Sequence, residues 1–169
     1  MARRGDGRLN APIAWQWRWP SVGAELRVSR SVAEVLMAHR QRAWQHERGG
    51  QLFVDATDPD GLLLTLATPP HPADRAGWTW LDLDPNRCRQ EIAQANARRL
   101  RLVGYWHTHP QLVPRLSGTD IASFATFAAT YATVLPCPLA IIVGKPDHPD
   151  GINAWSFRQG RPVQGVRHG

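Results

Sequence analysis

The stretch Tyr105-Trp106-His107-Thr108-His109-Pro110 is followed, after a short loop, by Ser117-Gly118-Thr119-Asp120. Alternate residues of a strand project to one face, so His107 and His109 present two imidazoles roughly 6.5 to 7 Å apart along it. Modest convergence lets both rings reach one ion at about 2.0 Å. Asp120, in the first turn of the next helix, can fold back onto this pair. A His2Asp set leaves one position of a tetrahedral metal open for water, so the spacing predicts a catalytic metal site.

Each half of this motif also has a purely structural interpretation. Two histidines separated by one residue are common on protein surfaces, and Ser117 with Asp120 matches a capping box at the start of a helix. The capping box and the metal site are compatible with each other. The complete four-residue spacing favours metal binding, because chance alone rarely produces it.

A metal-activated water needs a proton acceptor, and the chain contains only four glutamates: Glu25, Glu34, Glu47 and Glu91. Glu47 stands just before Gly49-Gly50, a pair that allows close approach of the backbone. We expect it at the C-terminal end of a helix, where an acid opposes the helix dipole. The residues alone leave two interpretations of Glu47 open, a general base or a solvated acid.

The sequence of a Glu before Gly-Gly, then H-x-H-P, then S-x-x-D resembles the JAB/MPN+ (JAMM) zinc metallopeptidases. The resemblance extends from Glu25 to about Phe157, which is most of the chain. It implies an α/β fold: a single JAB/MPN (cytidine-deaminase-like) domain with a mixed central sheet flanked by helices.

The resemblance also implies a role for each residue of the motif. His107, His109 and Asp120 would hold Zn²⁺. Glu47 would act first as the general base and then as the general acid, and the hydroxyl of Ser117 would steady the oxyanion.

Family members cut peptide or isopeptide bonds after the C-terminal glycine of ubiquitin-like proteins. Bacterial relatives include deubiquitinase-like enzymes and the deconjugases of CBASS and Bil antiphage operons. The expected partner is therefore a ubiquitin-like protein or its conjugate, together with operon-encoded activating and conjugating enzymes. Two alternatives remain open: a JAB peptidase that trims a sulfur-carrier protein, and a non-catalytic MPN-type scaffold, although the filled metal set speaks against the scaffold.

Composition narrows the class of protein further. The length of 169 residues suits one domain. Cys88 and Cys137 lie outside any C-x-x-C pair, so neither a disulfide framework nor a cysteine zinc cluster is expected. Without a signal peptide or a long apolar run, we expect a cytoplasmic protein with no membrane contact. The net charge of +6 comes from scattered arginines, so we do not expect nucleic-acid binding.

The chain divides into a flexible basic arm (1–12), the JAB/MPN+ domain (13–160) and a flexible tail (161–169). Within the domain we expect a helix from Ser29 or Ser31 to about Gln45. The other expected helices and strands are a short edge strand at 15–19, strands at 25–29, 51–56, 62–68, 78–84, 101–106, 139–143 and 153–157, and helices at 86–99 and 117–133.

Eight tryptophans are a further feature of the sequence. Trp15, Trp17 and Trp19 alternate on the expected edge strand, which indicates packing or an oligomer face. Trp78 and Trp80 follow a proline-rich loop that resembles the family's first insertion, where an extended substrate tail lies against a strand. Core packing is the favoured role for Trp78 and Trp80, and substrate contact is the alternative.

Overall fold

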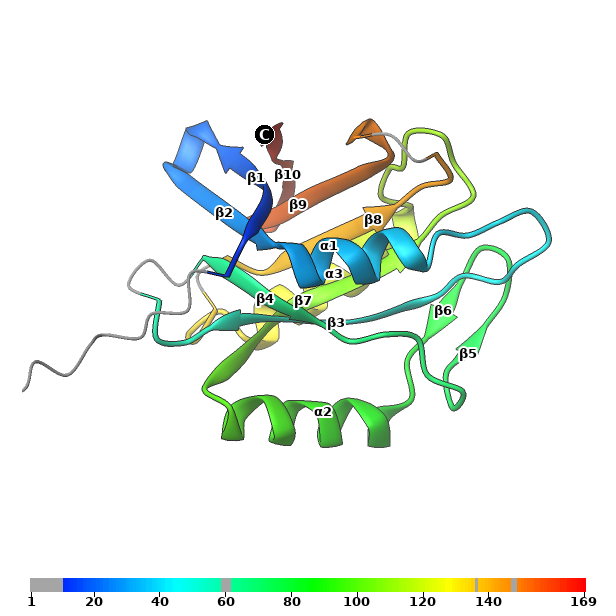
Figure 1. Ribbon diagram of the computed structural model, residues 1–169, viewed down its shortest axis with the longest axis horizontal. Helices are drawn as coiled ribbons and strands as arrows, with labels where there is room; N and C mark the ends of the chain where they lie inside the picture. The colour runs from blue at the N-terminus through cyan, green and yellow to red at the C-terminus, as the bar shows by residue number, and fades with distance from the viewer. Residues whose placement is uncertain (1–10, 59–61, 136, 147–148) are drawn as a thin grey trace, which may run out of the picture.

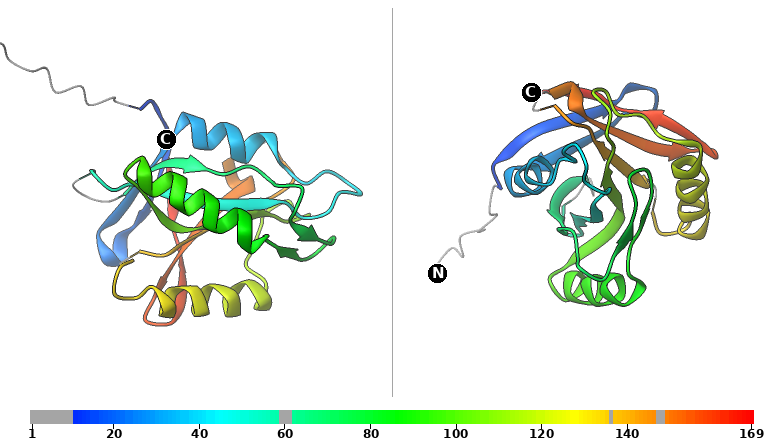
Figure 2. Two further views of the ribbon diagram at one scale, coloured as in Figure 1. Left: turned by 90° about the horizontal axis from the view of Figure 1, so that it is seen from below. Right: turned by 90° about the vertical axis from the view of Figure 1, so that its right-hand side faces the viewer.

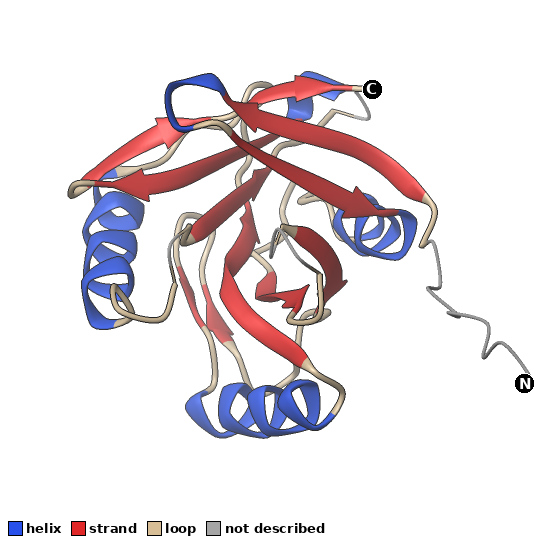
Figure 3. Ribbon diagram, turned by 90° about the vertical axis from the view of Figure 1, so that its left-hand side faces the viewer, coloured by secondary structure: helices blue, strands red, loops and turns tan. Residues whose placement is uncertain are grey.

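The computed structural model describes residues 11–58, 62–135, 137–146 and 149–169. A twisted sheet of nine strands forms its centre, in the order β10-β9-β8-β7-β3-β4-β2-β1-β11, with three helices around it (Figures 1 and 3). The strands of this sheet are β1 (Ile13–Trp19), β2 (Ala24–Ser29), β3 (Gly49–Asp55), β4 (Leu63–Ala67), β7 (Leu100–Thr108), β8 (Leu139–Val143), β9 (Ile152–Arg158), β10 (Arg161–Gln164) and β11 (Val166–His168). The short strands β5 (Arg75–Ala76) and β6 (Leu81–Asp82) form a separate ribbon.

The sheet is mixed, as expected: β7 pairs with β8 and β2 with β4 in parallel, and the other pairs are antiparallel. The helices are α1 (Arg30–Ala38), α2 (Pro85–Ala97) and α3 (Gly118–Thr130), and Figure 2 shows them at separate places around the sheet. Two short 3-10 turns, Pro20–Val22 and Pro149–Gly151, lie in connections. No helix in the described part of the chain is long and apolar enough to cross a membrane.

Strand β8 shows how the core is divided between the two faces of the sheet. Ile141 packs into the cluster that includes Leu36 of α1, whereas its neighbour Ile142 packs into the cluster that includes Phe124 of α3. A strand that is covered on both faces carries a continuous apolar run, as the sequence LAIIV of β8 does. Helix α2 covers a third cluster, in which its Ala95 lies with Phe53.

The first helix is shorter than expected. Helix α1 ends at Ala38 instead of about Gln45, so Glu47 lies in the loop before β3 and not at a helix exit. Side-chain hydrogen bonds hold this loop in a non-helical path: Arg48 Nη2 donates to the carbonyl of Arg40 at 2.9 Å, and Gln41 Nε2 donates to the carbonyl of Gln45 at 2.8 Å and to that of the distant Trp78 at 3.2 Å. The helical periodicity of the sequence gives no information about such bonds.

The prediction of a flexible tail at residues 161–169 is wrong, because this stretch forms the final strands β10 and β11. Residues 161–164 pair with β9, and residues 166–168 pair with β1, so the end of the chain joins the two edges of the sheet. The tryptophans of β1 explain why this tail is ordered. Trp19 Nε1 donates to the carbonyl of Val163 at 2.8 Å, and the Arg167 guanidinium lies 4.1 Å from the centre of the Trp15 ring. Of the expected N-terminal arm, residues 1–10 lie outside the described residues.

Of the predictions made for the tryptophans, one is confirmed in part and one is wrong. Trp15, Trp17 and Trp19 are buried, which confirms packing, but β1 lies between β2 and β11 and is therefore not an edge strand. The prediction that Trp78 and Trp80 pack in the core is wrong, because these side chains are 58% and 48% exposed. Only two residues of the expected strand at 78–84 form one.

The cause is a tight turn, in which the N–H of Gly77 donates to the carbonyl of Trp80 at 2.9 Å. The remaining strands and helices follow the sequence closely. The strands expected at 51–56 and 62–68 form the antiparallel pair of β3 and β4, and residues 59–61 of their connection lie outside the described residues.

Candidate metal centre

Strand β7 delivers the two histidines to the same place. It runs between β3 and β8 in the middle of the sheet. The position of its last residue is fixed by a hydrogen bond, in which the N–H of Thr108 donates to the carbonyl of Arg48 at 2.8 Å. The N–H of His109 donates to the carbonyl of Val143 at 2.9 Å. The Nε2 atoms of His107 and His109 consequently lie 3.1 Å apart. Both imidazoles point to one spot at the carboxyl end of β7.

Asp120 meets the two histidines from the start of α3. Its Oδ1 lies 3.0 Å from His107 Nε2, and its Oδ2 lies 3.3 Å from His109 Nε2. The capping box is present as well: the N–H of Asp120 donates to Ser117 Oγ at 3.1 Å, and the N–H of Ser117 donates to Asp120 Oδ2 at 2.6 Å. The cap holds the carboxylate in place, so the structural and the metal interpretations of this segment coexist.

These three side chains fit a zinc ion. In a tetrahedral site with bonds of about 2.0 to 2.2 Å, neighbouring donor atoms lie roughly 3.3 to 3.6 Å apart. His107 Nε2 and His109 Nε2 lie 3.1 Å apart, within a few tenths of an ångström of that range. Asp120 brings one oxygen to 3.0 Å from the first nitrogen and its other oxygen to 3.3 Å from the second, so its carboxylate reaches the same spot. Two neutral imidazoles and one carboxylate are also a donor set that zinc accepts.

Glu47 completes the cluster. Its side chain is 4% exposed, which excludes the solvated acid as an interpretation, and its Oε1 lies 3.8 Å from His109 Nε2. One donor atom from each of Glu47, His107 and His109 lies within 4.8 Å of the others. The glycine pair permits this approach: a Cβ on Gly49 would lie 2.3 Å from the carbonyl oxygen of Trp106. Any larger residue there would separate β3 from β7.

The charges of the cluster are strongly coupled. Burial raises the pKa of Glu47 from 4.5 to about 7, the charge of His109 opposes the shift, and Asp120 adds to it. Burial would also raise the pKa of Asp120, but hydrogen bonds from His107 and His109 outweigh it and hold that pKa far below its ordinary value. For His109, burial favours the neutral ring, yet Asp120 and Glu47 together raise its pKa. The two carboxylates therefore favour a positive charge at this spot.

A cavity of about 440 Å³ opens beside the cluster. Glu47, His107, Ser117 and Asp120 line one part of it, and the exposed side chain of Trp80 stands at another. The apolar part of its lining consists of side chains from the 81–83 segment, α3 and β7: Leu81, Leu83, Tyr105, Trp106, Phe124 and Phe127. Sequence reasoning did not assign Phe124 or Phe127 to the site, although their spacing of three on one helix was a signal that they share a face.

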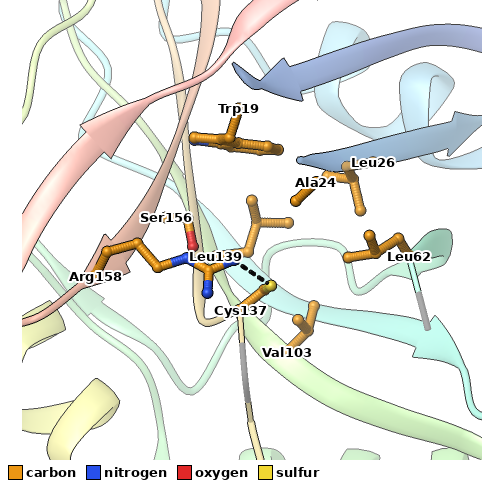
Figure 4. Close-up of a pocket in the computed structure, with 9 residues that line it drawn as sticks. All are labelled: Trp19, Ala24, Leu26, Leu62, Val103, Cys137, Leu139, Ser156 and Arg158. Atoms are coloured by element: carbon orange, nitrogen blue, oxygen red, sulfur yellow. Dashed lines mark hydrogen bonds between the residues drawn. The ribbon is translucent and has the colours of Figure 1, made fainter. Parts of the chain in front are cut away.

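A second cavity lies near the start of β8, which is the opposite end of this strand from the metal centre. It has a volume of about 10 Å³, roughly the room needed for one water molecule. Figure 4 shows Cys137 at this cavity, where its Sγ accepts a hydrogen bond from Arg158 Nη2 at 2.8 Å. Both cysteines are free, as the sequence predicted, and both are half-buried. Ser156 lines the same cavity.

Comparison with known proteins identifies the class. The family of prokaryotic homologues of the JAB domain matches residues 29–158, and the chain belongs to this family. The expected JAB/MPN-type α/β domain is thereby confirmed. No functionally curated protein matches the chain.

Two solved structures are similar in fold. Protein DSY2949 from Desulfitobacterium hafniense has a TM-score of 0.58 and 16% sequence identity, over 81% of this chain and 87% of that one. A protein from Salinibacter ruber has a TM-score of 0.49 and 18% identity, over 84% of this chain and 88% of that one. At such identities the first similarity speaks for the fold alone.

Proposed function

We propose that this protein is a zinc-dependent peptidase or isopeptidase that cleaves after the C-terminal glycine of a ubiquitin-like protein. One observation carries the proposal: the imidazoles of His107 and His109 and the carboxylate of Asp120 meet at one spot, and the buried carboxylate of Glu47 lies beside them. A scaffold that only binds a partner has no need for this combination. Membership of the prokaryotic JAB-domain family supports the same reaction class.

The metal, when bound by these three side chains, would supply positive charge that acidifies a water molecule and polarises the scissile carbonyl. Glu47 accepts the proton from the attacking water. Its carboxyl group, with a pKa raised to about 7 by burial, can both accept and return a proton near neutral pH. Glu47 then delivers this proton to the leaving amine, which makes a lysine ε-amine or an α-amine an acceptable leaving group.

Ser117 is placed to stabilise the oxyanion. Its Oγ accepts the N–H of Asp120 in the capping box, so the hydroxyl hydrogen remains available as a donor. Ser117 also lines the cavity beside His107 and Asp120. A donor aimed at charge that develops only in the transition state accelerates the reaction without tightening substrate binding.

The cavity supports an extended glycine-ended tail as substrate. It lies between the 79–83 segment and α3, and apolar rings are exposed at Trp80 in this segment and at Trp78 just before it. Glycine carries no side chain, so the main-chain carbonyl can approach the donor set closely. We propose removal or maturation of a ubiquitin-like modifier in a bacterial conjugation operon as the biological setting, with its activating and conjugating enzymes as operon partners.

The test uses ubiquitin-like proteins that end in glycine, linked to a reporter either through an α-peptide bond or through a lysine isopeptide bond. Zinc-loaded wild-type protein should release the reporter, and Glu47→Gln should not. A matched substrate with valine in place of the terminal glycine should resist cleavage. Cleavage of the α-linked fusion alone would assign maturation, and cleavage of the isopeptide would assign deconjugation. Failure to cut any glycine-ended substrate while zinc is bound would contradict the proposal.

A further inference from the structure

Arg87 lies near the start of α2, outside the metal cluster, and its buried side chain forms hydrogen bonds to several separate segments of the chain. Its side chain is 2% exposed, and that of its partner Asp74 is 6% exposed. Arg87 Nε and Nη2 donate to the two carboxylate oxygens of Asp74 at 3.0 and 2.9 Å, which makes the pair bidentate. The remaining N–H groups donate to Glu91 Oε1 at 2.7 Å, to the carbonyl of Pro69 at 3.1 Å and to the carbonyl of Gly49 at 3.0 Å. All five N–H groups of the guanidinium therefore have acceptors.

Asp74 in turn organises the loop that leads to the exposed tryptophans. Besides Arg87, it accepts the N–H of His71 at 3.1 Å and the N–H of Asp84 at 2.9 Å. Both ends of the 71–84 segment are thus bonded to one carboxylate. The ion pair joins this segment to α2. It also joins the segment to β3, because Arg87 donates to the carbonyl of Gly49, the first residue of that strand.

Glu47 is attached to this arrangement on both sides along the chain. Its own N–H donates to the carbonyl of Gly77 at 2.8 Å, within the segment that Asp74 organises. Two residues later, the carbonyl of Gly49 accepts from Arg87 Nη2 at 3.0 Å, and Gly49 is opposite His107 in the β3–β7 register. The backbone at Glu47 is therefore bonded to the segment that Asp74 organises, and two residues later the backbone is bonded to Arg87 itself.

Stability alone does not explain why this charge is buried. The desolvation of a buried ion pair usually offsets its attraction, and apolar residues of similar volume often serve a fold equally well. A planar guanidinium differs from them because its rigid fork fixes several acceptors relative to one another. We propose that Arg87 and Asp74 are positioning residues that set the carboxylate of Glu47 against the metal donor set. The inference rests on the proposed function, in which Glu47 moves the proton.

The test compares Arg87→Lys and Asp74→Asn with Arg89→Lys. Lysine keeps the charge but loses the fork, and Arg89 is an exposed arginine of the same helix, bonded to Asn86. We expect zinc binding to remain in all three variants, because the proposed ligands lie at the end of β7, directly after it and on α3, and none of them contacts Arg87 or Asp74. In the first two, kcat should fall about 10- to 100-fold with KM nearly unchanged, as expected for a displaced catalytic group. Arg89→Lys should behave as wild type.

Two readouts separate positioning from general support of the fold. In a Glu47→Gln background, Arg87→Lys should cause no further loss of activity, because the group that it positions is already gone. Amide hydrogen exchange, which needs no activity, should accelerate at residues 46–50 and stay unchanged in β8. If Arg87→Lys does not fold, Asp74→Asn supplies both measurements.

Unchanged exchange at 46–50, or faster exchange throughout the sheet, would overturn the positioning role. An equal further loss in the Glu47→Gln background would overturn it too. If the wild type cuts no substrate, the proposed function fails, and the exchange data still decide whether the pair fixes the segment of Glu47.

Discussion

Glu47 Oε1 lies 3.8 Å from His109 Nε2, although Glu47 precedes β3 and His109 follows β7. The two strands are antiparallel neighbours, and Gly49 is opposite His107 in their register. The start of one strand therefore meets the end of the other, and one strand pair fixes both the proposed base and a proposed ligand. The predictions below separate the roles of the residues gathered at this point.

The metal set is tested by zinc content. We expect about one equivalent of zinc per chain, and we expect its loss in the His107→Ala/His109→Ala double mutant, because two of three donors are removed. Asp120→Ala should lower zinc affinity as well. His71→Ala is the control, since His71 is exposed and lies outside the cluster. Elemental analysis of the purified proteins measures the result, and equal zinc in the double mutant and the wild type would remove these residues from the site.

Glu47→Gln distinguishes the proposed base from a ligand. The amide keeps the shape of the side chain but cannot accept the proton, so zinc should stay bound while turnover falls on the order of 10² to 10⁴-fold. Reporter release and zinc content are measured on the same samples. The exposed Glu34→Gln is the matched control. Cleavage by Glu47→Gln at the wild-type rate would show that Glu47 is not the base.

Ser117 caps α3 and is proposed to stabilise the oxyanion, and substitution can separate the two roles. Ser117→Ala removes the helix cap, at about 1 kcal/mol of stability, together with the hydroxyl, whereas Ser117→Gly costs only a few tenths as a cap. Both variants should retain zinc and lose about 10² to 10³-fold in kcat with little change in KM, because each lacks the oxyanion donor. Steady-state kinetics and thermal unfolding measure the two effects. Normal turnover in Ser117→Gly would restrict Ser117 to its capping role.

The raised pKa of Glu47 predicts how the stability of the metal-free protein depends on pH. Its pKa is 4.5 unfolded and about 7 folded, so the folded state binds the proton more tightly and loses stability as pH rises between these values. The penalty is absent below about pH 4.5 and complete above about pH 7, at up to about 3 kcal/mol. Glu47→Gln should therefore exceed the wild type in stability at pH 8 and approach it at pH 4.5.

Denaturant unfolding in the presence of a chelator measures this difference, with Glu34→Gln as the control. A stability gap between Glu47→Gln and wild type that is the same at pH 8 and pH 4.5 would contradict the buried, shifted carboxyl group.

The ordered tail is tested at Gly165, which joins β10 to β11. A Cβ at this position would lie 2.8 Å from the ring of Trp19, so Gly165→Val should cost about 1 to 3 kcal/mol through overpacking. Gly118→Ala is the comparison, because its Cβ would meet nothing within 4 Å. Denaturant unfolding compares the two variants, and a cost below about 0.5 kcal/mol at Gly165 would show that the tail does not pack on β1.

Local patterns in the sequence were sufficient for most strands and helices. The run Leu139–Val143 forms β8 within its expected bounds, and Ser29 and Ser117 cap helices as their positions predicted. The histidine pair and the capping-box acid could be found in the same way, because strand alternation and the first helical turn fix their directions over a few residues. These features depend on neighbours along the chain, so the sequence contains their cause.

Tertiary structure decided what depends on distant partners. Glu47 is buried because β3 pairs with β7 and the carbonyl of Gly77 accepts its N–H, and neither contact has a local pattern. The 161–169 tail is ordered because it covers tryptophans of β1, and Trp80 is exposed because a turn interrupts the expected strand. Periodicity reports which side of an element is apolar, but only the packed fold determines which other element covers that side and which charges come together.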